Sequence, residues 1–324
     1  MLRNLADYHW AEHIDDALLL MARLDVKTVP LAGGTYLLGL EDDSIEAVVD
    51  LRELDLAYIS EDTRGIHIGS MTTLQNLVDA PLLSSFASGL LSRAARASSS
   101  SRLIRNSATL GGTLGAGAVS QADLLTALSV LEAQVVVRSG SKTSVNLSGG
   151  TTERPGLALA GVVYRGKQER RIACDDVTRE RRPDELIVEV IIPSSNTNYG
   201  TGFARIGRTP TDIALLNVAA LVEIEQDMYR RVRLVFGGVN MEPIRVLAVE
   251  HLLEGQHIDD SRKLLNSVQT GIADFHPPTN ERVSGGYRRV SSVKLAQHAI
   301  EEALYFARRQ EASTIQPGAR REGR

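Results

Sequence analysis

Cysteine is nearly absent from this sequence: Cys174 is the single one among 324 residues. One thiol excludes an internal disulfide, a cysteine-ligated iron–sulfur cluster and a cysteine-rich zinc site. Two carboxylates follow it directly, Asp175 and Asp176, and they disfavour the thiolate that a catalytic cysteine needs. If the protein takes part in redox chemistry, it must therefore bind its redox centre as a cofactor.

Long apolar runs and a strong net charge are missing as well. Two of the longest apolar runs, residues 17–22 and 213–222 (interrupted by Asn217), are far shorter than the roughly 20 residues of a membrane helix. The formal charge of −4 gives no basic field for nucleic acid. The first ten residues lack the charged-then-apolar layout of a secretory signal. We expect a cytoplasmic protein with no membrane span and no nucleic-acid partner.

The remaining composition is that of a globular protein, with 43% hydrophobic and 23% charged residues. The length suggests about two domains, and a stretch rich in Ser, Asn and Gly at residues 194–200 is a plausible boundary. Before it, the pattern predicts strands at 28–32, 46–50, 66–68 (half-buried), 135–137, 162–164, 171–173 and 186–192, and helices at 15–24, 73–79, 84–97 and 124–133. Residues 98–123 read as irregular and 139–150 as turns. After it, we expect apolar segments at 212–225 and 232–236, and helices at 243–255, 259–274 and 291–310.

One short motif near the start of the chain matches a metal-binding pattern. His9-Trp10-Ala11-Glu12-His13 has the H-x-x-E-H spacing of an inverted zinc protease. That chemistry requires both histidines on one face of a helix, and the pentapeptide precedes the first convincing helix. We therefore interpret it as a polar loop, and we predict no metal site on this chain.

Two glycine-rich segments carry more information. The first is Leu31-Ala32-Gly33-Gly34-Thr35-Tyr36-Leu37-Leu38, and the second is Ala108-Thr109-Leu110-Gly111-Gly112-Thr113-Leu114-Gly115. Both are expected to follow an apolar strand. Paired glycines allow a ligand to approach the backbone closely, and successive N–H groups can then bind an anion. Neither segment has the spacing of a Rossmann or P-loop motif, so a phosphate cradle of another kind remains open beside an ordinary turn.

These segments resemble a known family. The sequence is similar to the flavin-binding medium subunit of the molybdenum hydroxylases, the carbon monoxide dehydrogenase and xanthine dehydrogenase group, over roughly residues 5 to 308. The first segment resembles A-G-G-T-[DH]-L-L, residues 68–73 resemble I-G-A-x-T-T, and residues 104–112 resemble I-R-N-x-A-T-I-G-G. Asp123 follows in the place of a family aspartate. The second half carries further similar residues at 208, 212–214, 237–239, 243, 250–255 and 286–289.

The resemblance implies an α+β fold. Residues 1–195 would form a two-subdomain FAD-binding fold of the vanillyl-alcohol-oxidase (PCMH) type, with subdomains at about 1–55 and 56–195. Residues 196–310 would form a C-terminal α+β domain with a small antiparallel sheet plus helices, and 311–324 a frayed tail. The FAD contacts implied by position are Ala32, Gly33, Gly34, Thr35, Tyr36 and Leu37, then Thr109, Gly111, Gly112 and Thr113, and finally Asp123 at the sugar, with Ile187 and Arg205 near the isoalloxazine.

The implied function is that of an electron-transfer flavoprotein subunit, with no catalytic residue of its own. A large partner would hold the molybdenum cofactor and a small partner two [2Fe-2S] clusters, in a dimer of heterotrimers. Tyr36 stands where the family has an acid or a histidine, and Thr113 where it has an asparagine. These departures keep a scaffold subunit without FAD open as an alternative. A free-standing flavin oxidoreductase and a small-molecule-binding module without redox function are further alternatives.

Overall fold

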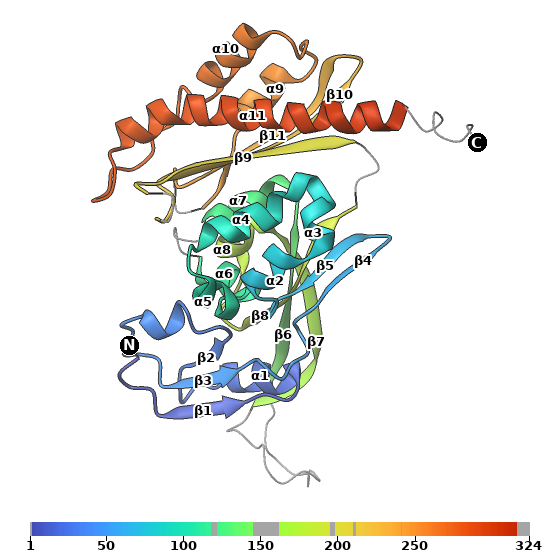
Figure 1. Ribbon diagram of the computed structural model, residues 1–324. Coiled ribbons are helices and arrows are strands. Elements are labelled where there is room, and N and C mark those ends of the chain that lie inside the picture. Colours follow the sequence, from blue (N-terminus) through green and yellow to red (C-terminus); the bar gives the residue numbers. More distant parts are fainter. Residues whose placement is uncertain are drawn as a thin grey trace, which may run out of the picture.

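The structure, a computed structural model, describes residues 2–117, 122–144, 162–194, 198–209, 212–240 and 242–315. Its strands form three sheets, which succeed one another along the chain and from one end of the molecule to the other (Figure 1). Helices lie between and outside these sheets. The mixture of helices and sheets confirms the predicted α+β class.

The N-terminal sheet is small and parallel, with the strand order β1-β3-β2. Its strands are β1 (Asp7–Trp10), β2 (Thr28–Leu31) and β3 (Ala47–Asp50), and α1 (Ile14–Met21) connects the first two. The central strand β3 is buried along its whole length. Because the strands are parallel, the carboxyl ends of β2 and β3 share one edge, and the first glycine segment leaves the sheet at this edge.

The middle sheet is antiparallel and has the order β4-β5-β8-β6-β7. Its strands are β4 (Ile59–Asp62), β5 (Gly65–Gly69), β6 (Gln134–Ser144), β7 (Val162–Ala173) and β8 (Glu185–Pro193). Every residue of β5 is buried, including His67, so the prediction of a half-buried strand there is wrong. The separate strands predicted at 162–164 and 171–173 are one strand, and β6 continues to Ser144 through residues predicted as turns. The rest of that turn prediction, residues 145–150, lies outside the described part.

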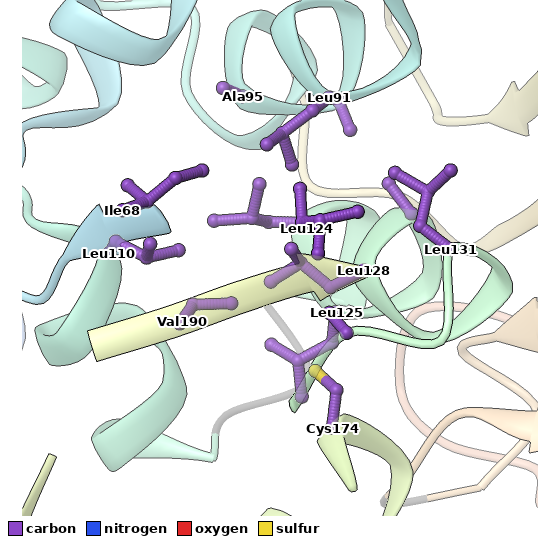
Figure 2. Close-up of a cluster of buried hydrophobic side chains, with 14 of the residues drawn as sticks. Ile68, Leu91, Ala95, Leu110, Leu124, Leu125, Leu128, Leu131, Cys174 and Val190 are labelled. Atoms are coloured by element: carbon purple, nitrogen blue, oxygen red, sulfur yellow. The ribbon is translucent and has the colours of Figure 1, made fainter. Parts of the chain in front are cut away.

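Helices cover one face of the middle sheet. They are α2 (Leu74–Asp79), α3 (Pro81–Ser85), η2 (Phe86–Gly89), α4 (Leu90–Ser98), α5 (Arg102–Ser107), α6 (Leu110–Ala116), α7 (Ala122–Val130), η4 (Cys174–Asp176) and α8 (Val177–Glu180). Side chains of α4, α6, α7 and the sheet form the largest core cluster, and Figure 2 shows Leu91, Leu110, Leu124, Leu128 and Val190 within it. This core fixes the helices that approach the candidate site.

Two predictions in this region are wrong, one of a helix and one of an irregular segment. The helix predicted at 84–97 is interrupted, because Ala87 and Ser88 adopt positive φ angles of 48° and 54° before α4 begins. The segment 98–123, predicted to be irregular, contains α5 and α6. Their N-caps are Ser101 and Thr109, whose side-chain oxygens accept hydrogen bonds from the backbone N–H groups of Ile104 and Gly112.

The C-terminal sheet is antiparallel with the order β12-β11-β10-β9. It contains β9 (Tyr199–Ile206), β10 (Leu216–Glu225), β11 (Met228–Gly237) and β12 (Ile244–Arg245), and it is followed by α9 (Leu247–Leu253), α10 (Ser261–Gly271) and α11 (Gly285–Ile315). Along β10, Val218 and Ala220 pack toward these helices, whereas Ala219 and Leu221 join the core of the preceding half. The sheet is therefore sandwiched between its own helices and the helices of the middle region (Figure 1).

Several boundaries in this half differ from the sequence-based expectation. β10 starts at Leu216 rather than at 212, and the helix expected from Pro243 starts at Leu247, because Ile244 and Arg245 pair with β11 as β12. The long helix α11 continues to Ile315, five residues into the expected tail, and residues 316–324 lie outside the described part. None of the helices in the described ranges is long and apolar enough to cross a bilayer.

Candidate cofactor-binding site

The first glycine segment leaves the parallel sheet directly after β2. Gly34 has a positive φ of 69°, which turns the backbone and which glycine adopts without strain. Within the described residues, the N–H groups of Gly33, Gly34, Thr35 and Tyr36 form no hydrogen bond. Thr35 and Tyr36 are exposed. Four successive N–H groups without an acceptor, at the carboxyl edge of a parallel sheet, form a backbone site of the kind that binds anions.

The second glycine segment is built differently from the expectation. It follows α5 rather than a strand, and Gly111 and Gly112 lie in the first turn of α6. Three N–H groups of that turn are already hydrogen-bonded within the protein. Leu110 N donates to Thr72 O (2.9 Å), Gly111 N to Ser70 O (2.7 Å) and Gly112 N to Thr109 Oγ1 (3.0 Å). The N–H groups of Leu110, Gly111 and Gly112 are therefore already bonded, whereas those of Gly33 to Tyr36 have no acceptor within the described residues.

The two glycine segments touch each other through their glycine positions. A Cβ placed on Gly33 would stand 1.8 Å from the carbonyl oxygen of Ser107, and one on Gly112 would lie 3.6 Å from the Ala32 Cβ. On the other side, a Cβ on Gly111 would meet the Ser70 Cβ at 2.6 Å. The glycines thus allow the second segment to pack against the first, while the N–H groups of Gly33 to Tyr36 keep no acceptor in the described part of the chain.

Asp123 and Arg205, predicted from distant parts of the sequence, come together. Asp123 lies in the first turn of α7 and is 2% exposed, and the Nε of Arg205, on β9, lies 3.4 Å from its Oδ2. Asn217 on β10 donates from Nδ2 to Asp123 Oδ1 at 2.6 Å. Burial raises the pKa of Asp123, while Arg205 and Asn217 act in the opposite direction.

The other predicted contact residues are spread around these groups. Ile187 on β8 is buried in the main core, and its Cδ1 would lie 3.9 Å from a Cβ on Gly115 of α6. The Thr113 side chain is buried, and its hydroxyl donates to Thr109 O at 2.8 Å. Tyr36 is 38% exposed, and Leu37 opens the short helix η1 (Leu37–Gly39). Of these side chains, Tyr36 is the most accessible to a bound molecule.

The structure also places the two motifs set aside in the sequence, His9–His13 and Cys174. His9 is in β1 and His13 caps α1, so the motif is a strand end and a helix start rather than the polar loop that was expected. Over the described residues, no group of three or more histidine, cysteine or acidic side chains could hold a metal ion. Cys174 is buried, and desolvation, with Asp175 nearby, raises the pKa of its thiol.

Sequence reasoning missed three residues that shape the site. Ser70 accepts the Gly111 N–H through its backbone carbonyl, and Thr126 and Asn217 form a buried hydrogen bond of 2.8 Å beside Asp123. Asn217 had a signal, since it is the polar residue that interrupts the apolar run at 213–222. A polar side chain in a buried strand needs a partner, and here that partner is on another element.

Comparisons with known proteins agree with this arrangement. Residues 3–152 match the profile of the FAD-binding domain in molybdopterin dehydrogenase, and residues 202–303 match that of the CO dehydrogenase flavoprotein C-terminal domain. The glyceraldehyde dehydrogenase medium chain of Sulfolobus acidocaldarius is 25% identical over 91% of this chain and 97% of its own length. The nicotinate dehydrogenase FAD-subunit of Eubacterium barkeri is 34% identical over 57% of this chain and 56% of its own length.

A solved structure extends the likeness to the fold. The crystal structure of the cyanide-inactivated Cu,Mo-CO dehydrogenase contains a chain that superimposes with a TM-score of 0.78 at 22% identity, covering 94% of this chain and all of that one. The FAD-binding profile precedes the C-terminal profile along the chain, as the N-terminal sheet precedes the C-terminal sheet. The FAD-binding profile covers both glycine segments and Asp123. This chain belongs to the family of FAD-binding medium subunits of the molybdenum hydroxylases.

Proposed function

We propose that this chain binds FAD at the first glycine segment and serves as the electron-transfer subunit of a molybdenum-containing dehydrogenase. The observation that carries the proposal is the run of four N–H groups, from Gly33 to Tyr36, that have no acceptor within the described residues. A pyrophosphate brings the oxygen acceptors that such a run requires. The FAD-binding profile over residues 3–152 supports the same assignment.

The residues present fit FAD at the backbone level. An added Cβ on Gly33 would meet the carbonyl oxygen of Ser107, so this close contact requires glycine at position 33, whereas one on Gly112 would meet the Thr109 hydroxyl of its own segment. Asp123 supplies a carboxylate, and Thr109 supplies a hydroxyl, which accepts the Gly112 N–H and keeps its own proton available for donation. Tyr36 and Thr113 differ from the family pattern in side chains, whereas the proposed phosphate contacts come from the backbone.

When bound, FAD would supply the redox chemistry, which is electron transfer from iron–sulfur clusters of a partner to an external acceptor. The part of this chain is to bind and orient. The N–H groups of Gly33 to Tyr36 would hold the phosphates, Asp123 would accept a hydrogen bond from the sugar, and Ile187 and Arg205 would border the ring system. No proton transfer by a side chain is needed for this role, in agreement with the absence of a predicted catalytic residue.

The same proposal implies which subunits assemble with this chain. A large subunit with the molybdenum cofactor and a small subunit with two [2Fe-2S] clusters are the partners, in a dimer of heterotrimers, and the single cysteine agrees with clusters held elsewhere and with a cytoplasmic setting. We divide the chain near residues 55 and 195, with a C-terminal domain at 196–310. This division is supported by the three sheets, each of which lies within one of the resulting parts.

The experiment is an FAD titration of the purified, flavin-free full-length chain, followed by gel filtration and measurement of flavin absorbance in the protein peak. We expect one FAD per chain, with FMN, which lacks the pyrophosphate and adenosine, retained far less. The complex, purified through a tag on this chain, should contain molybdenum and iron. If neither the chain nor the complex retains FAD, the electron-transfer proposal is wrong and the scaffold alternative replaces it.

A further inference from the structure

Two residues opposite each other in the C-terminal sheet hold the carboxylate of Asp123 from two sides. Arg205 on β9 and Asn217 on β10 are direct partners in the antiparallel pairing. Arg205 Nε lies 3.4 Å from Oδ2 of Asp123, and Asn217 Nδ2 donates to Oδ1 at 2.6 Å. Asp123 itself belongs to α7, a helix of the FAD-binding half. A site residue of one half is thus oriented by a pair of residues from the other half.

The direction of every hydrogen bond in this cluster follows from chemistry. A carboxylate can only accept, so Asn217 must present its amide NH₂ to Asp123. Its amide oxygen then points away, and it accepts the hydroxyl of Thr126 at 2.8 Å. Thr126 lies one turn after Asp123 on the same helix. The amide of Asn217 is therefore held at both ends by α7.

The burial of these residues determines how much the loss of one hydrogen bond would cost. Asn217 and Thr126 are fully buried and Asp123 is 2% exposed, so water cannot replace a lost partner without rearrangement. A buried polar group left unsatisfied costs more than an ordinary hydrogen bond contributes. Without Asn217, one carboxylate oxygen would lose its short, fixed partner, and the side chain could rotate about its Cα–Cβ bond toward Arg205.

We propose that Asn217, fixed by Thr126, is a positioning residue that orients the Asp123 carboxylate toward FAD, an inference that rests on the function proposed above. Asn217 acts through Asp123 and does not itself touch the cofactor. The C-terminal domain is accordingly part of the FAD site: it completes the geometry of an aspartate that the FAD-binding domain carries.

The test is a double-mutant cycle on the full-length chain, with the dissociation constant of FAD measured by quenching of flavin fluorescence. We expect Asp123→Ala to weaken FAD binding about 30-fold and Asn217→Ala about 10-fold. In the Asp123→Ala background, adding Asn217→Ala should change the dissociation constant less than about twofold, because the group that Asn217 positions is gone. A merely structural role would instead give the same loss in both backgrounds.

Two further variants distinguish a loss of positioning from misfolding or a general loss of stability. Thr126→Val keeps the shape of the side chain and removes only the outer hydrogen bond, and it should weaken FAD binding about threefold. Thr201→Val is the matched control: Thr201 is also fully buried on β9, and its hydroxyl donates to Ala87 O in the FAD-binding half, four strand positions from Arg205. It should leave FAD binding within about twofold of the unchanged chain.

The outcomes separate this inference from the proposed function. Equal effects of Asn217→Ala with and without Asp123, or an effect of Thr201→Val as large as that of Thr126→Val, would overturn the positioning role while FAD binding stands. An Asp123→Ala chain that binds FAD normally would overturn it too, since there would be no contact to position. Failure of the unchanged chain to bind FAD would instead reject the proposed function itself.

Discussion

Gly33 lies against the backbone of Ser107, so closely that a Cβ on Gly33 would be 1.8 Å from the Ser107 carbonyl oxygen and 3.1 Å from the Ala108 Cα. The two residues are 74 positions apart in the sequence. Their contact joins the first glycine segment to the end of α5, just before the second segment. In the first segment the N–H groups of Gly33 to Tyr36 have no acceptor among the described residues, whereas in the second those of Leu110, Gly111 and Gly112 are already bonded. The proposed FAD cradle therefore depends on a backbone-to-backbone contact.

Gly33→Ala tests that contact. The added methyl group meets a backbone carbonyl, which cannot rotate away as a side chain can, so the first segment must move from the second. We expect FAD binding to weaken at least about 100-fold and the free energy of unfolding to fall by about 1–3 kcal/mol. The measurements are the FAD titration described above and urea unfolding of the flavin-free chain.

The matched control for Gly33 is Gly39→Ala. Gly39 is the last residue of η1 and directly follows the same segment, and a Cβ there would have no atom from elsewhere in the described residues within 4 Å. This variant should bind FAD as the unchanged chain does. If Gly33→Ala also bound FAD normally, the contact with Ser107 would be irrelevant to the cradle.

Local sequence signals were sufficient where a feature depends on neighbouring residues. The segments around Gly33 and Gly112 stood out by composition, and Thr73 was included in a helix that it indeed caps, accepting the Asn76 N–H. Asn217 was visible only as an interruption of an apolar run. Its role required knowledge of β9 and α7, which lie beside it in space and far from it in sequence.

The errors have a common physical origin in long-range contacts that override local propensity. Glycine disfavours helices, so residues 111 and 112 were expected in a loop, yet the N–H groups of Leu110 and Gly111 are bound by Thr72 O and Ser70 O, which fix the first turn of α6. Likewise, Ala87 adopts a positive φ, and its carbonyl accepts the hydroxyl of Thr201 from the C-terminal sheet. No local sequence pattern predicts either contact.

Gly202 illustrates a packing role that sequence reasoning also missed. A Cβ on this residue would be 2.0 Å from the carbonyl oxygen of Ala299, where α11 crosses β9. Gly202→Ala should therefore push the helix from the sheet and lower the free energy of unfolding by about 1–3 kcal/mol. Thermal unfolding measures this effect, and the control is Gly286→Ala near the start of α11, where a Cβ would have no atom from elsewhere in the described chain within 4 Å. Equal melting temperatures for the two variants would contradict this account.

Cys174 provides a chemical test of the core. It lies among the buried side chains shown in Figure 2, and it is 1% exposed. Because desolvation raises the pKa of the thiol, and only the thiolate reacts, the native chain should react with a disulfide reagent at least about tenfold more slowly than the same chain in 6 M guanidinium. Rapid modification of the native chain, with Cys174→Ser as the blank, would show that this core opens.

Asp62 predicts a dependence of stability on pH. The backbone N–H of Arg64 donates to Asp62 Oδ1 at 2.7 Å, and with the side chains of Arg64 and His67 it lowers the pKa of Asp62 from 3.8 to about 2. Since the pKa is lower in the folded chain, the ionised form stabilises the fold above about pH 4, and that contribution is lost as the pH falls toward about 2.

Asp62→Asn should therefore destabilise the chain at neutral pH, and the difference in the free energy of unfolding between this variant and the unchanged chain should shrink below about pH 4. Urea unfolding at a series of pH values measures this, with Glu61→Gln on the same strand as the control. A difference that stays constant from neutral to acidic pH would mean that the carboxylate charge of Asp62 contributes nothing to stability.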